Sequence, residues 1–372
     1  MSTESPTRAL KRRGVSLWLD DLSRERILGG GLQALIDGLD ISGVTTNPTI
    51  FAAALASSTS YQAEITRLAR ERASASDAAL RLMTGDVAAA ADILEPTYSA
   101  TEGADGWVSI EVGADVAHDT AATLDEARRL HRSVGRPNVF VKIPATRAGL
   151  GAIAGAIAEG ISVNVTLIFG LQRYQEVVDA YLHGLEQAAG RGLDLRGIRS
   201  VASFFVSRVD AAVDARLAAI DSVAGAELSG AVGIANSRLA LDVFDERFRS
   251  DRAARLVERG AHPQPLLWAS TGVKDPRMPD TRYVDSLATA RSIITMPEAT
   301  LRALADHGQP GDLRDLEVES ARAVIERLGE VGISYDDLVE GLERRGLEQF
   351  ERSGKQLLDT VETAMSAPRS AA

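Results

Sequence analysis

The sequence predicts an α/β protein built as a closed parallel (β/α)8 TIM barrel, on three observations. Eight short apolar runs, rich in β-branched or aromatic residues, alternate along the chain with longer amphipathic stretches. Each amphipathic stretch is long enough to form the right-handed crossover between two parallel strands. A count of eight strands favours closure into a barrel over the alternative, an open doubly wound sheet.

The predicted strands are bounded by Gly, Pro, Asn or Asp, which commonly end regular structure. In chain order they span residues 15–20, 43–47, 107–112, 138–143, 162–166, 199–206, 265–270 and 292–296. The clearest crossover helices span residues 119–132, 171–189 and 208–220. The glycine cluster at 29–31 lacks the spacing of a dinucleotide-binding loop, because Ala34 stands where the last glycine belongs.

Three regions exceed a minimal barrel. Residues 52–104 are expected to hold more than one helix between the second and third strands. Residues 208–262, between the sixth and seventh strands, are expected to hold at least two helices, including one over 227–248. Residues 312–365 form a helical, charged C-terminal extension that we expect to wrap the outside of the barrel.

The two ends of the chain, about 1–13 and 366–372, are expected to be disordered. The first 14 residues are polar and basic without an apolar core, unlike a signal peptide. No run of 18 apolar residues is present, so no membrane span is expected. We expect residues 1–372 to form a single barrel domain, as a cytoplasmic monomer or homodimer.

Composition limits the chemistry that the chain can perform. The formal net charge of −11 argues against a nucleic-acid surface, although a local basic pocket could still bind an anion. The chain has no cysteine, which excludes disulfides, thiolate catalysis and cysteine-bound metals. The five histidines are scattered and form no H-x-x-x-H pair, so no metal site is expected.

Lysine is rare in this chain. Of 41 basic residues, the only lysines are Lys11, Lys142, Lys274 and Lys355. A lysine can lose its proton and act as a nucleophile, whereas an arginine in practice cannot. Lys142 lies within a predicted buried strand, where it forms either a structural ion pair, for example with Glu111, or a reactive amine.

Polar side chains gather near the C-terminal ends of seven predicted strands. Strands of a parallel barrel are covered on both sides and should be largely apolar, and charged groups left inside cost stability unless paired or functional. Barrel enzymes place their chemistry at the C-terminal mouth. A one-residue shift in the first strand would point Asp21 instead of Asp20 inward. The predicted site comprises Asp20, Thr45, Asn47, Ser109, Glu111, Lys142, Asn164, Thr166, Ser203, Phe205 and Ser270.

This set of residues suits Schiff-base chemistry on a polyol phosphate. A buried amine loses its proton more readily than one in water and can attack a carbonyl. Forming the imine expels water, and cleaving a carbon–carbon bond beside a hydroxyl needs a base, so Glu111 and Asp20 could divide these tasks. Arg208, after the sixth strand, and Lys274, after the seventh, offer phosphate contacts.

Five ordered segments resemble the transaldolase family, and the likeness covers about residues 14–360. They are GVTTNPTIF, VSIEV, NVFVKIPAT, GISVNVTLIF and SFFVSRVD. The segment ITMPEATL and the long helical C-terminus are similar to those of the bacterial subgroup with longer chains. The first strand, SLWLDD, matches weakly.

The resemblance implies a role for each catalytic position. Lys142 matches the Schiff-base lysine, and Asp20 matches the acid/base that handles the C4 hydroxyl proton of the substrate. Glu111 and Thr166 match the pair that holds a catalytic water.

The resemblance also implies binding residues. Thr45, Asn47, Asn164 and Ser203 match contacts to substrate or intermediate. Arg208 matches a phosphate-binding arginine. Many members have a second phosphate-binding arginine after the seventh strand. It is not evident here, and Lys274 with Ser270 is expected to take its place.

The implied reaction is ping-pong transfer of a dihydroxyacetone unit from sedoheptulose 7-phosphate to glyceraldehyde 3-phosphate, giving erythrose 4-phosphate and fructose 6-phosphate. No cofactor or metal is expected, because the iminium itself is the electron sink. Two alternatives stay open: a fructose 6-phosphate aldolase and a non-catalytic phosphosugar-binding barrel. The aldolase relatives carry Tyr where Phe205 stands and Gln where Glu111 stands.

Overall fold

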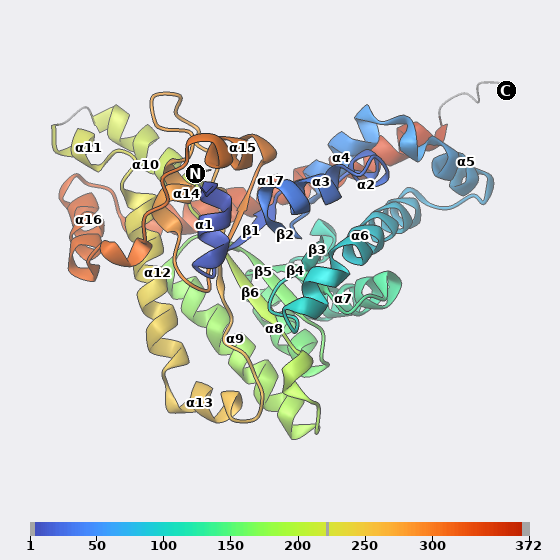
Figure 1. The fold of residues 1–372 in the computed structure, drawn as a ribbon, viewed down its shortest axis with the longest axis horizontal. Helices are drawn as coiled ribbons and strands as arrows, with labels where there is room; N and C mark the ends of the chain where they lie inside the picture. The colour runs from blue at the N-terminus through green and yellow to red at the C-terminus, as the bar shows by residue number, and fades with distance from the viewer. Residues whose placement is uncertain (1–3, 221–222, 367–372) are drawn as a thin grey trace.

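The computed structural model describes residues 4–220 and 223–366, and a closed barrel of eight parallel strands forms its centre (Figure 1). Each strand pairs with the next, and the eighth closes against the first. The predicted barrel is confirmed, and each predicted strand overlaps an observed one. The strands are β1 (Ser16–Leu19), β2 (Ile41–Val44), β3 (Trp107–Glu111), β4 (Val139–Pro144), β5 (Val163–Ile168), β6 (Ser200–Phe205), β7 (Leu266–Ala269) and β8 (Ile293–Met296).

Helices surround this barrel. They are α1 (Pro6–Arg12), α2 (Arg24–Leu28), α3 (Gly31–Leu39), α4 (Pro48–Ser57), α5 (Gln62–Arg70), α6 (Ala75–Ala100), α7 (Thr120–Val134), α8 (Arg147–Ala158), α9 (Leu171–Gly190), α10 (Ser207–Ile220), α11 (Val223–Leu228), α12 (Val232–Phe248), α13 (Asp251–Val257), α14 (Arg282–Leu287), α15 (Glu298–His307), α16 (Val318–Glu330) and α17 (Tyr335–Ser366). The predicted extra helices therefore lie between β2 and β3, between β6 and β7, and at the C-terminus. Within the described residues, no helix combines the length and apolarity needed to cross a membrane.

An aromatic layer fills the barrel interior beneath the polar residues. The rings of Trp107 and Phe140 stack with their centroids 4.0 Å apart, and Trp18 lies against Phe140 at 6.1 Å. Gly43 is paired with Trp18, and a Cβ atom there would overlap the indole ring. Only glycine therefore fits at this point of β2. The layer leaves the space above it, toward the C-terminal strand ends, for polar side chains.

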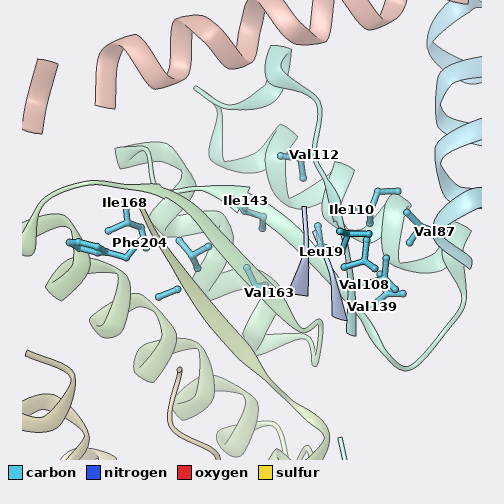
Figure 2. Packing of buried hydrophobic residues seen from close by; sticks show 14 of the residues in the cluster. Leu19, Val87, Val108, Ile110, Val112, Val139, Ile143, Val163, Ile168 and Phe204 are labelled. Atoms are coloured by element: carbon cyan, nitrogen blue, oxygen red, sulfur yellow. The ribbon is translucent and has the colours of Figure 1, made fainter. Parts of the chain in front are cut away.

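The alternate side chains of the strands point outward into an aliphatic layer. Figure 2 shows part of it, with Val108, Ile110 and Val139 gathered near Val87 of α6. All four side chains are fully or almost fully buried. Burying an aliphatic side chain of this size contributes about 1.5–3 kcal/mol to folding, so this layer fixes the strands that carry the polar residues.

Two predicted elements have different bounds in the structure. The second strand ends at Val44, not at residue 47, because Asn47 caps α4 by accepting a hydrogen bond from the Ile50 amide at 3.0 Å. The helix predicted over 227–248 is broken between α11 and α12. Gly230 lies in the break with φ of 67°, a left-handed conformation that ends helices.

The termini also depart from the prediction. Residues 6–12, expected to be disordered, form α1, which Ser5 caps by accepting a hydrogen bond from Arg8 and which has Pro6 in its first turn. Residue 366, also expected to be disordered, ends α17, and residues 1–3 and 367–372 lie outside the described residues. The C-terminal extension does not only wrap the outside of the barrel. Helix α17 runs across the C-terminal strand ends, and Figure 1 shows it spanning from near α16 to α5.

Candidate active site

A cavity of about 400 Å³ opens at the C-terminal mouth of the barrel. All but one of the twelve residues predicted to act in catalysis or binding line it; the exception is Asn164. The barrel register explains this gathering, because side chains two apart on a strand share its inner face. The lining members of the predicted set are Asp20, Thr45, Asn47, Glu111, Lys142, Thr166, Ser203, Phe205, Arg208, Ser270 and Lys274.

Lys142 lies near the C-terminal end of β4, directly beside Glu111 of β3 in the strand register. Both side chains are buried. The Lys142 Nζ atom is 3.5 Å from Glu111 Oε2 and donates a hydrogen bond to the Thr46 carbonyl oxygen at 3.1 Å. The amine is therefore held at the floor of the cavity with a carboxylate as its immediate neighbour.

Asp20 follows β1 and reaches into the same cavity. Its Oδ1 atom accepts a hydrogen bond from the Thr45 hydroxyl at 3.0 Å, and that hydroxyl also lies 2.7 Å from the hydroxyl of Thr295. Asp21 instead forms an ion pair with Arg26 at 2.6 Å and does not line the cavity. The structure thus places Asp20, and not its neighbour, on the inner face.

The two carboxyl groups share an electrostatic environment. Burial raises the pKa of Asp20 and of Glu111 above their ordinary values, and the positive charge of Lys142 opposes the rise in both. A raised carboxyl pKa brings its titration closer to neutral pH, where a group can both accept and return a proton.

A hydrogen-bonded chain runs beneath the cavity. The Ser203 hydroxyl donates to Asn164 Oδ1 at 2.7 Å, and the Asn164 side-chain amide donates to the Ser109 hydroxyl at 3.0 Å. Asn164 is completely buried, so it holds Ser203 in place from below. Thr166 lines the cavity, and its buried hydroxyl has no hydrogen-bond partner among the described residues.

Two cations also line the cavity, Arg208 and Lys274. Arg208, in the first turn of α10, has its guanidinium carbon 5.1 Å from the centre of the Phe205 ring. Burial lowers the pKa of Arg208, and the negative charges of Asp20 and Glu111 oppose this effect. Lys274 is exposed at the rim, and Ser270, with φ of 56°, shares a hydrogen bond with Ser207 at 2.9 Å. No carboxylate among the described residues pairs with Arg208 or Lys274.

Sequence reasoning missed part of the cavity wall. Thr295, a polar residue near the end of β8, follows the same pattern as the residues found on the other strands and could have been identified from it. Helix α17 also contributes to the lining, and its amphipathic pattern gave no indication of which surface it covers. Its lining residues are Gly346, Gln349, Phe350 and Ser353.

Comparison with known proteins agrees with this geometry. The family model described as transaldolase/fructose-6-phosphate aldolase matches residues 17–361. A protein named transaldolase from Arthrobacter sp. (strain FB24) is 50% identical over 368 residues, covering 99% of each chain. One from Kocuria rhizophila is 50% identical, covering 98% of this chain and 100% of its own. Transaldolase 1 of Streptomyces avermitilis is 51% identical, covering 96% and 94%. The chain belongs to the transaldolase/fructose-6-phosphate aldolase family.

Proposed function

We propose that this chain, a transaldolase, transfers a dihydroxyacetone unit between phosphosugars through a Schiff base on Lys142. One observation carries the proposal: the Lys142 amine is buried at the floor of the cavity, beside Glu111, with the separately held Asp20 lining the same space. The amine supplies the nucleophile, and the two carboxyl groups supply two independent sites for proton transfer.

The first half of the reaction begins with the neutral Lys142 amine attacking the C2 carbonyl of sedoheptulose 7-phosphate. The carbinolamine loses water to give the iminium, with Glu111 and Thr166 moving protons through a water held between them. Asp20 then takes the proton of the C4 hydroxyl, the C3–C4 bond breaks, and its electron pair enters the iminium to form an enamine. Erythrose 4-phosphate leaves.

The second half runs these steps in reverse with glyceraldehyde 3-phosphate. The enamine carbon attacks the aldehyde, and Asp20 returns its proton to the new C4 alkoxide. Water held by Glu111 and Thr166 then hydrolyses the iminium, and fructose 6-phosphate is released. The free Thr166 hydroxyl and the Glu111 carboxyl group, which line the same cavity, support this role for a water.

Substrate orientation rests on the remaining lining residues. Thr45, Asn47 and Ser203 supply hydroxyl and amide groups for the sugar hydroxyls. Asn164, predicted to contact substrate, makes two hydrogen bonds that favour a positioning role through Ser203. Arg208 and Lys274, which also line the cavity, provide positive charge for the phosphate, and Ser270 provides a hydroxyl group.

The aldolase alternative differs in the fate of the enamine. A transferase must keep the enamine from protonation until an acceptor arrives, whereas an aldolase protonates it and releases dihydroxyacetone. Phe205 offers the cavity an apolar ring without a proton donor, and its ring also packs against Phe169 at 5.1 Å. This apolar wall supports retention, and with it the transferase.

The discriminating experiment gives the purified protein fructose 6-phosphate with and without erythrose 4-phosphate. With acceptor, we expect equal amounts of sedoheptulose 7-phosphate and glyceraldehyde 3-phosphate. Without acceptor, an enzyme-linked assay should detect little free dihydroxyacetone. Rapid release of dihydroxyacetone without acceptor would support the aldolase instead.

The single-domain organisation, the cytoplasmic location and the monomeric or homodimeric state also stay predictions. Analytical ultracentrifugation would measure the oligomeric state.

A further inference from the structure

A second hollow adjoins the outer end of the active-site cavity. It is a groove of about 480 Å³ between α10 and α17, and it shares Arg208 and Gly346 with the cavity wall. Its apolar surface comes from Ala211, Ala212, Ala215 and Leu342. Arg216 and Arg345 also line it. The groove therefore leads directly to the residue that we place at the substrate phosphate.

Three guanidinium groups converge over Gly341 of α17. A methyl group built on Gly341 would lie 3.4 Å from Arg345 Nη1 and 4.0 Å from both Arg216 Nη2 and Arg344 Nη2. The absence of a side chain at Gly341 leaves this point open. Arg208, Arg216 and Arg345 thus line the groove that adjoins the cavity, and Arg344 lies beside it.

These arginines differ from the many arginines of the chain that form ion pairs with carboxylates. Elsewhere in the chain, Arg252 pairs with Glu186 at 2.7 Å and Arg314 with Asp245 at 2.6 Å. Within residues 4–220 and 223–366, no carboxylate forms an ion pair with Arg208 or with the three arginines over Gly341. Like charges this close repel one another, and a chain with a net charge of −11 has many acids available to neutralise them. The cluster is therefore suited to an anion from outside the chain.

A phosphate monoester fits this anion site best. It carries up to two negative charges and three acceptor oxygens, which can bond several guanidinium groups at once. The groove has a volume of about 480 Å³ and is bounded by two helices, which suits a small phosphate ester better than a polymer. A local positive field at the mouth should also speed the association of anionic substrates with this negatively charged protein.

We propose that Arg216 and Arg345, with Arg344, form a capture site that binds the phosphate of an incoming phosphosugar before it moves inward to Arg208. This inference rests on the proposed function, since it takes Arg208 as the inner phosphate contact. Ping-pong transfer sends one aldose phosphate out and another in through the same mouth, across which α17 runs. A relay of phosphate contacts along α17 lets the acceptor be held while the first product leaves.

The test compares Arg216→Gln, Arg345→Gln and the double variant with the wild type. For erythrose 4-phosphate at low ionic strength, we expect kcat/KM to fall by about three- to tenfold through a higher KM. The loss should disappear in high salt, where charges at the surface are screened. Arg255→Gln on α13 is the matched control, because Arg255 is exposed and unpaired among the described residues, and Figure 1 shows α13 far from α17. It should match the wild type.

A second measurement does not depend on catalysis. Inorganic phosphate should raise the Tm of the wild type and of Arg255→Gln, and should raise it less in the double variant. Wild-type-like KM, salt dependence and phosphate response in the double variant would overturn the capture site, as would an equal effect of Arg255→Gln. If the wild type formed no imine with fructose 6-phosphate yet kept its arginine-dependent phosphate response, the proposed function would fail while the anion site stood.

Discussion

Glu111 and Lys142 occupy paired positions on adjacent strands, and the Lys142 amine lies 3.5 Å from a Glu111 carboxylate oxygen. This separation is an ion-pair distance but longer than a well-formed hydrogen bond. The firmer contact of the amine is with the Thr46 carbonyl oxygen, which cannot neutralise its charge. Lys142 and Glu111 are therefore close enough to form an ion pair, and both groups still line the cavity, where they can react with a substrate.

Asp20→Asn should impair carbon–carbon cleavage more than imine formation, because the base acts on a hydroxyl two carbons away from the imine. The variant should accumulate a ketose adduct that borohydride can trap, while transfer falls by about 10²–10⁴-fold, the usual contribution of a general base. Rapid-quench trapping measures the adduct. Asp21→Asn is the matched control and should transfer normally, since Asp21 pairs with Arg26 outside the cavity. The opposite pattern would reverse the assignment.

The raised pKa of Asp20 should affect the pH dependence of both transfer activity and stability. As the base, Asp20 must be ionised, so transfer should rise with pH, with its acidic limb above the usual range for an aspartate. A raised folded-state pKa also means that the folded protein binds this proton more tightly than the unfolded chain. Protonation of Asp20 therefore stabilises the folded protein below the unfolded-state pKa, and this stabilisation is lost as pH rises through the folded-state pKa.

Urea unfolding across pH measures this linkage. Asp20→Asn should flatten the loss of unfolding free energy with rising pH, and should leave the variant at least as stable as the wild type at neutral pH. The asparagine can still accept the Thr45 hydrogen bond. Identical pH slopes in the two proteins would contradict a strongly desolvated Asp20.

Arg208→Ala should weaken binding of phosphorylated substrates by about 1.5–3 kcal/mol, the value of a hydrogen bond to a charged group. Acceptors without phosphate, such as glyceraldehyde, should be nearly unaffected. Comparing kcat/KM for phosphorylated and unphosphorylated acceptors isolates the phosphate contribution. An equal loss for both would remove Arg208 from the phosphate site and point to its packing against Phe205 instead.

Phe205→Tyr should shift the enzyme from transfer toward hydrolysis. The added hydroxyl can position water or donate a proton to the enamine, so release of dihydroxyacetone from fructose 6-phosphate should increase and transfer to erythrose 4-phosphate should decrease. Phe350→Tyr is the control, because Phe350 of α17 lines the same cavity. Phe204 is unsuitable as a control, because it is fully buried in the outer layer. If both variants released dihydroxyacetone equally, position 205 would have no special role.

The barrel could be predicted from sequence because each strand is a short apolar run and each strand end carries polar residues that a core would exclude. Alternation puts Ser109 and Glu111, or Ser203 and Phe205, on one face of their strand, and the structure shows that Glu111, Lys142 and Ser203 line the cavity. The second strand is predicted too long because Thr45 and Thr46 extend the β-branched pattern as far as Asn47, whereas Asn47 acts as a helix cap. The cap and the strand end look alike in a single sequence.

Other features depend on contacts that a sequence does not contain. The apolar stripe of α17 shows which face is buried but not that Phe350 and Ser353 cover the barrel mouth. The gathering of Arg216 with Arg345 joins α10 to α17 across more than a hundred residues, and no local pattern indicates it. The break at Gly230 could have been suspected from the glycine, although its neighbours continue the helical pattern.

Borohydride reduction in the presence of fructose 6-phosphate, followed by mass mapping, tests whether Lys142 forms the Schiff base. We expect one dihydroxyacetone-derived or hexose phosphate-derived adduct, on Lys142. We expect none in Lys142→Arg, which keeps the charge but cannot form an imine. Lys274→Arg is the matched control, since Lys274 lines the same cavity, and it should still be trapped at Lys142. An adduct on Lys274, or undiminished trapping in Lys142→Arg with its fold intact by circular dichroism, would contradict the account.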